Sequence, residues 1–438
     1  MRGRRRLAGL AAVGALVAGC SGSGGDEGSP GANGEKDAES RASAAPSPEA
    51  EQTPPDTQLS VPALYDTSRG WESTEEGTQF PLPRTGAVAL YWERTSEVAP
   101  TEHGFTVLDA TTGERRWSSV PIGPLGSTDL PHFRATVDGR EYLVAWSTGV
   151  TGADAINRGE EITAIDIFPA DSSGEAVEPL RVELPGEREV RNGGAGLLVR
   201  DGDDSVVAVD PATGDTTEYL VDDQEPPADC PDCHESWMVK GITENGPLMG
   251  TRTDIDYGGL WVPGGWATSD LRPPGTDPEN DPSVGLVSDH LLVLGWGEEA
   301  ASGETVWTAV DSASGETLAT VNCAGDRSSE TDVHLSANGR YLAHGNRVFD
   351  LEEGTGVCFQ RTETTNAVEF RLASDPGVIY GYAIEPQGFT AAERPVQLDM
   401  RTGEIEQFDD IDIDLPFGDT AGYGLFWDGT LVAYPHAE

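Results

Sequence analysis

The chain has 438 residues, and its 76 Asp and Glu residues outnumber its 28 Lys and Arg residues, which gives a formal net charge of −48 at pH 7. Nucleic acid and direct adhesion to anionic lipid are excluded as expected roles, because both depend on clustered basic side chains. The acidity favours solubility, or the capture of cations or a basic partner. Hydrophobic residues make up 37% of the chain, enough to bury a large interior.

Residues 1–20 are predicted to be an export signal. Arginines within residues 2–6 precede an apolar run over residues 7–17, which is too short to span a bilayer. The signal ends in Val17-Ala18-Gly19-Cys20, which resembles the lipobox of bacterial lipoproteins. The resemblance implies that a diacylglyceryl group is attached to Cys20 and that the chain is cleaved before it. We therefore expect an exported protein, anchored to the membrane by lipid and facing the extracytoplasmic side.

Residues 21–60 are predicted to be a disordered tether. They contain no aromatic residue, Leu59 is their only aliphatic residue larger than Ala, and Gly, Ser, Ala, Pro and Glu dominate. Such a composition cannot bury enough surface to fold. A flexible tether of this length reaches roughly 35 Å, from about 5–6 Å times the square root of its length. The folded part is expected to cover residues 61–438.

A turn motif recurs along the folded part. In the copy from Asp109 to Trp117, Asp and Thr can accept hydrogen bonds from nearby backbone N–H groups, and Gly113 can adopt the positive φ that closes a hairpin. Each copy follows a strand-like run such as Val306–Val310. The five turns contain Asp109 and Gly113, Asp210 and Gly214, Asp311 and Gly315, Asp350 and Gly354, and Asp399 and Gly403. A looser copy is expected from Asp166 to Gly174.

Two stretches resemble known propeller repeats. Ser336 to Ala343 is similar to a strand of Trp-Asp-repeat and TolB-like β-propellers, and Asp109 to Trp117 is similar to the quinoprotein-type (PQQ-like) repeat. The resemblance implies an all-β fold, a β-propeller whose blades have four antiparallel strands. An open two-sheet sandwich is the alternative.

The spacing of the turns predicts seven blades. One blade takes about 40–50 residues, so the longer gap between Asp210 and Asp311 is expected to conceal a degenerate blade at residues 246–269. Its strands are expected near residues 248–253 and 259–262. We find no first strand ahead of Gly86. The hairpin at residues 422–434 is therefore expected to pair with the N-terminal part and to complete one blade.

Four cysteines remain besides Cys20, and an even number in an exported chain predicts disulfides. We predict the pairs Cys323–Cys358, across adjacent blades, and Cys230–Cys233, within one loop. Alternatively, Cys230, Cys233 and His234 match the attachment pattern of a c-type haem, with Met238 or Met249 as second ligand. Zinc binding or redox exchange at this pair is a further alternative.

Acidic clusters suggest calcium only weakly. Asp201, Asp203 and Asp204 are the candidate ligands. Asp410, Asp412 and Asp414 alternate with apolar residues and therefore predict a strand with one solvated face. No metal or cofactor is otherwise predicted.

Catalytic motifs are absent from the sequence. The His residues are scattered, and no Gly-x-Ser-x-Gly elbow or phosphate-binding loop occurs. Quinoprotein enzymes of the resembled family hold their cofactor with calcium and often a vicinal disulfide, and no adjacent Cys pair exists here. We predict a non-catalytic binding or scaffold module whose protein or small-molecule ligand lies at a propeller face. The alternative is an envelope enzyme, a quinoprotein-like dehydrogenase or a hydrolase, which carboxylates and His converging at the channel mouth would favour.

Overall fold

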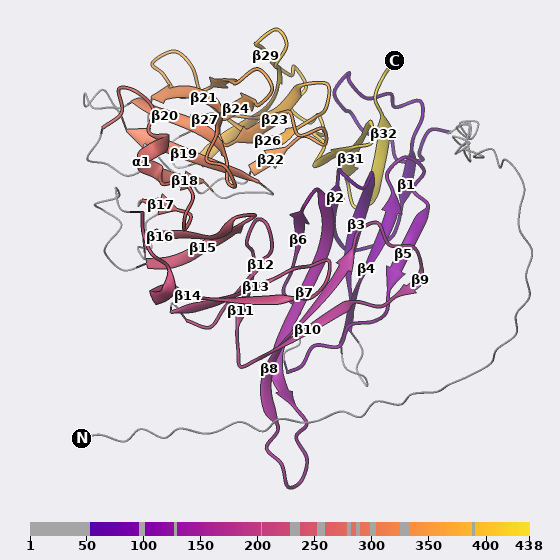
Figure 1. The fold of residues 1–438 in the computed structure, drawn as a ribbon. Coiled ribbons are helices and arrows are strands. Elements are labelled where there is room, and N and C mark those ends of the chain that lie inside the picture. The colour runs from indigo at the N-terminus through magenta and orange to yellow at the C-terminus, as the bar shows by residue number, and fades with distance from the viewer. Residues whose placement is uncertain are drawn as a thin grey trace, which may run out of the picture. The chain divides into compact units, whose positions relative to one another are not determined.

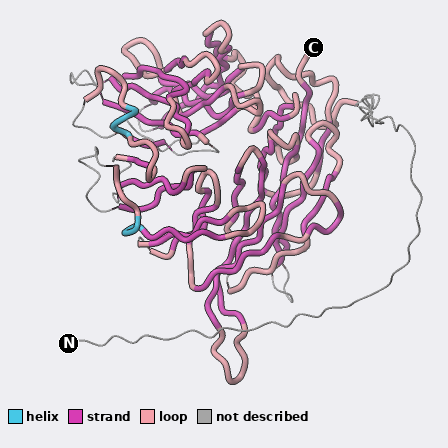
Figure 2. Tube along the Cα trace, in the orientation of Figure 1, coloured by secondary structure: helices cyan, strands magenta, loops and turns pink. Residues whose placement is uncertain are grey.

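The computed structural model describes residues 53–95, 101–126, 129–202, 204–227, 237–251, 259–277, 282–285, 290–297, 304–324, 333–387 and 390–438. They belong to the second of two units, Met1–Ala50 and Glu51–Glu438. Strands dominate this unit (Figure 2), so the predicted all-β class is confirmed. The helices within the described ranges are the short η1 (Val221–Asp223) and α1 (Thr268–Leu271). No described helix has the length and apolarity needed to cross a membrane.

The described strands form seven hydrogen-bonded sheets, of which one has eight strands and consists of two antiparallel groups joined by a single parallel bridge. Counting these two groups separately gives eight antiparallel groups, which we call sheets 1 to 8 (Figure 1). Sheet 1 contains β2 (Thr78–Leu82), β3 (Ala87–Arg94), β4 (Glu102–Asp109) and β5 (Arg115–Ser119). Sheet 2 contains β6 (His132–Val137), β7 (Arg140–Thr151), β8 (Glu160–Pro169) and β10 (Leu180–Pro185), and β9 (Gly174–Val177) runs parallel to β5 of sheet 1. Sheet 3 contains β11 (Glu189–Asn192), β12 (Leu197–Arg200), β13 (Ser205–Val209) and β14 (Thr216–Leu220). Sheet 4 contains β15 (Trp237–Thr243), β16 (Gly246–Thr251) and β17 (Leu260–Trp261).

The second half of the chain continues the pattern. Sheet 5 contains β18 (Ser283–Gly285), β19 (Leu291–Gly297), β20 (Glu304–Asp311) and β21 (Thr317–Ala324). Sheet 6 contains β22 (Val333–Leu335), β23 (Tyr341–His344), β24 (Arg347–Asp350) and β25 (Thr355–Cys358), and one parallel bridge joins β21 to β25. Sheet 7 contains β26 (Ala367–Ala373), β27 (Val378–Gln387), β28 (Thr390–Asp399) and β29 (Glu404–Gln407). Sheet 8 contains β30 (Gly418–Thr420), β31 (Tyr423–Trp427), β32 (Leu431–Pro435) and β1 (Trp71–Ser73).

The hydrophobic core is divided among the sheet interfaces. Each of eight clusters of buried side chains in the described residues joins two consecutive sheets. The last cluster packs Leu425 and Ala433 of sheet 8 against Val88 and Leu90 of sheet 1. Consecutive residues of a strand point to opposite faces, so the apolar run in β3 serves two interfaces at once. The packing order of the sheets is therefore cyclic, which the alternative of two sandwiched sheets does not explain.

The predicted turn chemistry is confirmed. The side chain of Asp109 accepts hydrogen bonds from the backbone N–H and the hydroxyl of Thr111, at 2.8 and 2.6 Å. Gly113 has φ of +71° and donates its N–H to the Asp109 carbonyl. Asp210, Asp311, Asp350 and Asp399 likewise accept backbone N–H groups two or three residues ahead.

The prediction that a looser copy of the turn begins at Asp166 is wrong. Asp166 lies inside β8, its side chain is buried, and it pairs with Arg181 on the neighbouring strand at 3.2 Å. The turn itself follows Pro169 and ends at Gly174. The spacing was misleading because Asp166 pairs with Arg181 across the sheet and does not close a turn.

Tryptophans hold several sheets to their neighbours. Trp71 of sheet 8 donates its indole N–H to the carbonyl of Ala110 in sheet 1, at 2.9 Å. Trp117 of sheet 1 donates in the same way to Ala170 of sheet 2, at 3.0 Å. A Cβ added at Gly113 would lie 2.7 Å from the Trp71 ring. Gly113 therefore has two functions: it adopts the positive φ of the turn, and its missing side chain leaves room for the indole of Trp71.

The two ends of the folded unit are joined, as predicted. β1 pairs with β32, with Trp71 opposite Ala433. The buried carboxylate of Asp419 accepts hydrogen bonds from Tyr65 at 2.9 Å and from His436 at 2.8 Å. Both terminal segments thus bind the same side chain.

The predicted count of seven blades is not confirmed, because the described strands form eight groups. The sequence pattern indicates no strand ahead of Gly86, and it therefore places the terminal hairpin in the first blade. β2 supplies that missing strand and completes sheet 1, so the terminal hairpin and β1 form a sheet of their own. β2 contains Pro81 and only one fully buried residue, Leu82, which is why its pattern was weak.

Two other local predictions have different outcomes. The degenerate repeat exists as sheet 4, whose β16 and β17 overlap the predicted strands. The strand predicted at Asp410 to Asp414 is wrong: this stretch contains a turn, and the side chain of Ile411 is 60% exposed. The alternation failed because Asp410 accepts the N–H of Asp412 within the turn.

Candidate functional site

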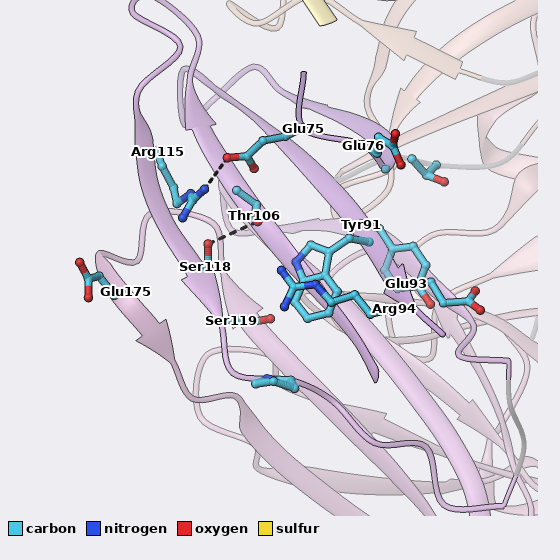
Figure 3. Close-up of a pocket in the computed structure, with 14 residues that line it drawn as sticks. Glu75, Glu76, Tyr91, Glu93, Arg94, Thr106, Arg115, Ser118, Ser119 and Glu175 are labelled. Atoms are coloured by element: carbon cyan, nitrogen blue, oxygen red, sulfur yellow. Dashed lines mark hydrogen bonds and ion pairs between the residues drawn. The ribbon is translucent and has the colours of Figure 1, made fainter. Parts of the chain in front are cut away.

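A groove of about 860 Å³ lies on sheet 1 (Figure 3). Strands β3 and β4 of sheet 1 have eight residues each, whereas the strands of sheet 8 have three to five, so sheet 8 covers only part of this face. Sheet 8 covers Val88 and Leu90, and the same face continues to Trp92 and Arg94, which line the groove. The lining residues are Glu75, Glu76, Gly77, Thr78, Tyr91, Trp92, Glu93, Arg94, Thr106, Arg115, Ser118, Ser119, Pro121 and Glu175.

A glycine lets the indole of Trp92 lie against the sheet. Gly104 is the partner of Trp92 on the neighbouring strand. A Cβ at this position would lie 2.6 Å from the Ser119 hydroxyl and would also meet the Trp92 ring. The guanidinium of Arg94 lies over the indole, 4.4 Å from the ring centroid. Trp92 therefore contacts both the neighbouring strand and Arg94.

The charge of the lining is negative, with four glutamates and two arginines. Arg115 pairs with Glu75 at 2.5 Å, and the hydroxyls of Thr106 and Ser118 lie 3.3 Å apart. Glu76, Glu93 and Glu175 form no ion pair with any residue that the structure describes. The groove can consequently attract a cationic group through its carboxylates, whereas the ring of Trp92 is already stacked with Arg94.

A buried polar cluster underlies the groove. The Tyr91 hydroxyl is hydrogen-bonded to Nδ1 of His103 at 2.7 Å, and the Tyr91 ring stacks on His132 with centroids 3.5 Å apart. Burial, with a smaller effect of the Glu93 and Asp129 charges, raises the pKa of Tyr91 to about 12. Burial also lowers the pKa of His132, although its hydrogen bond to the Leu130 carbonyl opposes that shift. Tyr91 and His132 are therefore both neutral at pH 7, and the cluster packs sheet 1 against sheet 2.

A second cavity of about 560 Å³ borders sheets 6, 7 and 8. His334, Glu369 and Arg371 line it together with the aromatic rings of Tyr382 and Phe417. Arg371 stacks over the Tyr382 ring at 5.3 Å and lies 3.6 Å from Glu369. Because its arginine is already paired, this cavity offers less unbalanced charge than the groove on sheet 1.

The cysteine predictions have different outcomes. The predicted disulfide Cys323–Cys358 is present and joins β21 of sheet 5 to β25 of sheet 6. Cys20, Cys230, Cys233 and His234 lie outside the described residues, so the lipid anchor, the second disulfide and the haem pattern stay predictions.

Two of the three calcium candidates lie within the described residues. Asp201 is exposed and lies 3.4 Å from Arg188, which already supplies a positive charge. Asp204 is also exposed, and Asp203 lies outside the described residues.

Sequence reasoning missed the groove. Its residues come from the segment before β2 and from β3, β4, β5 and β9, and no motif connects them. One local signal existed: Trp92 and Arg94 continue the inward-facing alternation of β3, and such residues are exposed only where the neighbouring sheet ends.

No protein-family model matches the chain, and no curated protein matches it. Distant likenesses to solved structures were found. The uncharacterized protein lmo1340 from Listeria monocytogenes EGD-e is 10% identical, with 81% of this chain and 90% of that chain covered and a TM-score of 0.35. Hsv2p from Kluyveromyces lactis is 10% identical, with 76% and 97% covered and a TM-score of 0.32.

A third likeness is to Sqt1 from Chaetomium thermophilum, which was solved bound to the N-terminus of the ribosomal protein L10. It is 12% identical, with 80% of this chain and 93% of that chain covered and a TM-score of 0.32. At these scores the likenesses assign neither fold family nor activity.

Proposed function

We propose that this chain is an exported lipoprotein whose β-propeller of eight blades binds a basic segment of a protein partner in the groove of sheet 1. The cyclic packing of the eight sheets and the joined ends support a propeller. The Val17-Ala18-Gly19-Cys20 ending supports a lipid anchor. A flexible tether between the anchor and the folded part would let the folded part stand off the membrane.

The observation that carries the binding role is the composition of the groove. Glu76, Glu93 and Glu175 line the groove together with the stacked pair of Trp92 and Arg94. Lys and Arg side chains carry a cation that these carboxylates can attract, and a long apolar stem that can lie along the groove.

The test is fluorescence anisotropy of a labelled peptide of alternating Lys and Gly with the detergent-solubilised full chain at low salt. The groove variant replaces Glu76, Glu93 and Glu175 by Gln. We expect its affinity to fall about tenfold, because three favourable charge interactions of about 0.5 kcal/mol each are lost.

A matched control carries Glu218→Gln, Glu404→Gln and Glu406→Gln, which removes the same charge from exposed strands of sheets 3 and 7. The control should bind as tightly as the wild type. Equal losses in both variants would show that binding follows net charge alone and would refute the groove as the site, as would a wild type that does not bind the peptide.

The anchor has its own test. Replacing Cys20 by Ala should move the protein from the membrane fraction to the soluble extracytoplasmic fraction and abolish labelling by radioactive fatty acid. Persistence in the membrane fraction without labelling would contradict the lipid anchor.

A further inference from the structure

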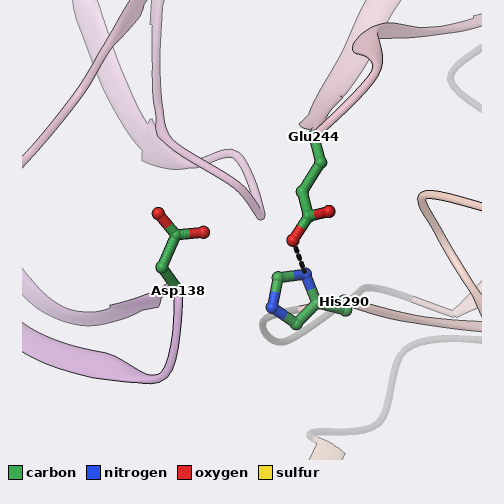
Figure 4. Close-up of side chains that lie close together, drawn as sticks. All are labelled: Asp138, Glu244 and His290. Atoms are coloured by element: carbon green, nitrogen blue, oxygen red, sulfur yellow. Dashed lines mark ion pairs between the residues drawn. The ribbon is translucent and has the colours of Figure 1, made fainter.

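Three side chains that could bind a metal converge at the ends of three different sheets (Figure 4). Asp138 lies in the turn between β6 and β7 of sheet 2, Glu244 lies in the turn between β15 and β16 of sheet 4, and His290 directly precedes β19 of sheet 5. Their potential ligand atoms all lie within 4.8 Å of one another. The carboxylate of Glu244 is 3.7 Å from Nδ1 of His290.

The backbone fixes where these side chains emerge. The Glu244 turn is held by sheet 3, because Ile242 exchanges backbone hydrogen bonds with Gly193 and Ala195 at the tip of that sheet. The carbonyl of His290 accepts the N–H of Ser312 at 2.6 Å. Asp138 has φ of +50° in a tight turn that Gly139 completes. Fixed backbones with partly exposed side chains allow the ligand atoms to close in by small rotations.

We propose that Asp138, Glu244 and His290 form a binding site for a divalent transition-metal ion of the Zn²⁺ type. Zn²⁺ bonds to imidazole nitrogen and carboxylate oxygen are about 2.0–2.2 Å long, so tetrahedral ligand atoms lie roughly 3.5 Å apart. The Glu244–His290 separation of 3.7 Å is already close to that spacing. Three protein ligands leave a fourth position for water or for a group on another molecule.

The donor set decides which ion is bound. An imidazole nitrogen favours Zn²⁺, Co²⁺ or Ni²⁺, whereas Ca²⁺ takes six to eight oxygen ligands. Two carboxylates also balance the charge of a divalent ion. A guanidinium nitrogen of Arg84 lies 3.6 Å from the place of a Cβ at Gly139, so a positive charge stands near the Asp138 turn. Because this positive charge repels a cation, we expect the site to bind Zn²⁺ with micromolar rather than nanomolar affinity.

This site differs from the groove, and it bears on the rival function. Carboxylates and a histidine that converge from separate sheets are the pattern that would favour an envelope enzyme over a binding module. An open fourth position on Zn²⁺ can lower the pKa of a bound water to about 7, as in zinc hydrolases. Metal binding should be tested first, because it is required for that chemistry and is independent of peptide binding in the groove.

The test is isothermal titration of Zn²⁺ into the metal-free full chain that carries Cys230→Ser and Cys233→Ser, so that these thiols cannot bind the ion. We expect one equivalent to bind in the micromolar range and Ca²⁺ in tenfold excess not to compete. His290→Ala should weaken binding at least tenfold, and Asp138→Asn and Glu244→Gln should each do so as well. Binding should also weaken on acidification, since the ligands must be deprotonated.

Matched controls are Asp171→Asn and Glu316→Gln, which neutralise exposed carboxylates in turns of sheets 2 and 5. They should bind Zn²⁺ as the parent does. Titration of Co²⁺ should give the visible bands of a four-coordinate ion without sulfur ligands in the parent, and His290→Ala should lose them. No binding by the parent, or binding that His290→Ala leaves unchanged, would overturn the site.

Discussion

Sheets 1 and 4 contact the next sheet in the same way, although only sheet 1 carries the repeat turn. In sheet 1, Trp117 is fully buried and donates its indole N–H to Ala170 of sheet 2. In sheet 4 the strand β17 has only two residues, yet Trp266 donates to Ser312 of sheet 5 at 3.0 Å. The comparison separates two functions of the repeat: the turn fixes the hairpin within a sheet, and the tryptophan fixes one sheet to the next.

The largest expected effect tests this separation directly. Trp117→Ala and Trp266→Ala should each lower the free energy of unfolding by about 3–5 kcal/mol, because each leaves a large cavity and an unpaired carbonyl. Urea unfolding followed by circular dichroism measures both losses. A loss below about 1 kcal/mol for Trp266→Ala would show that sheet 4 does not depend on its tryptophan.

The interface of sheets 5 and 6 sharpens the comparison, since a disulfide crosses it. Cys323 and Cys358 are 35 residues apart in the sequence. Replacing both by Ser should cost about 2–4 kcal/mol, mainly because the unfolded chain regains conformational freedom. Urea midpoints of this variant and of the reduced wild type measure the cost. A stability equal to that of the oxidised wild type would mean that packing alone holds this interface.

A pair of turn glycines isolates the contribution of the indole contact. Gly315 and Gly403 have φ of +76° and +71°, but only a Cβ at Gly315 would meet a neighbour, 2.6 Å from Trp266. We expect Gly315→Ala to cost about 2–3 kcal/mol and Gly403→Ala about 1 kcal/mol. Thermal and urea unfolding of the two variants compare them. Equal costs would mean that the positive φ matters and the indole contact does not.

The smallest expected effect concerns the stability of the protein at alkaline pH. It depends on Tyr91, which lies with Trp117 between sheets 1 and 2. The pKa of Tyr91 is raised to about 12 in the folded protein, above the value of about 10 in the unfolded chain. Between these values the folded state retains a proton that the unfolded state loses, so stability falls as the pH rises. Relative to Tyr91→Phe, the wild type should lose about 1 kcal/mol more at pH 11 than at pH 8. Urea unfolding at each pH measures both stabilities. If the free energy of unfolding falls equally with pH in the wild type and in Tyr91→Phe, the raised pKa of Tyr91 is contradicted.

Prediction from the sequence was most successful where the cause is local. Asp109 and Gly113 fix their own hairpin, and the same chemistry recurs in the four other predicted turns. The failures at Asp166 and Asp410 show the limit, since an Asp in a suitable pattern can also serve a strand ion pair or a turn. The disulfide was predicted because only a few cysteines can pair. The groove could not be predicted from the sequence, because its position depends on where sheet 8 stops covering sheet 1.

The sequence by itself determined the all-β class, the repeated hairpins, the joining of the chain ends and the Cys323–Cys358 bond, because each follows from the periodicity of a strand, the conformational freedom of glycine or a choice among few partners. Only the tertiary structure decided that the described strands form eight sheets and that Trp92 is left uncovered. It alone brought Asp138, Glu244 and His290 together. These outcomes depend on contacts between residues far apart in the chain, which neither spacing nor composition encodes.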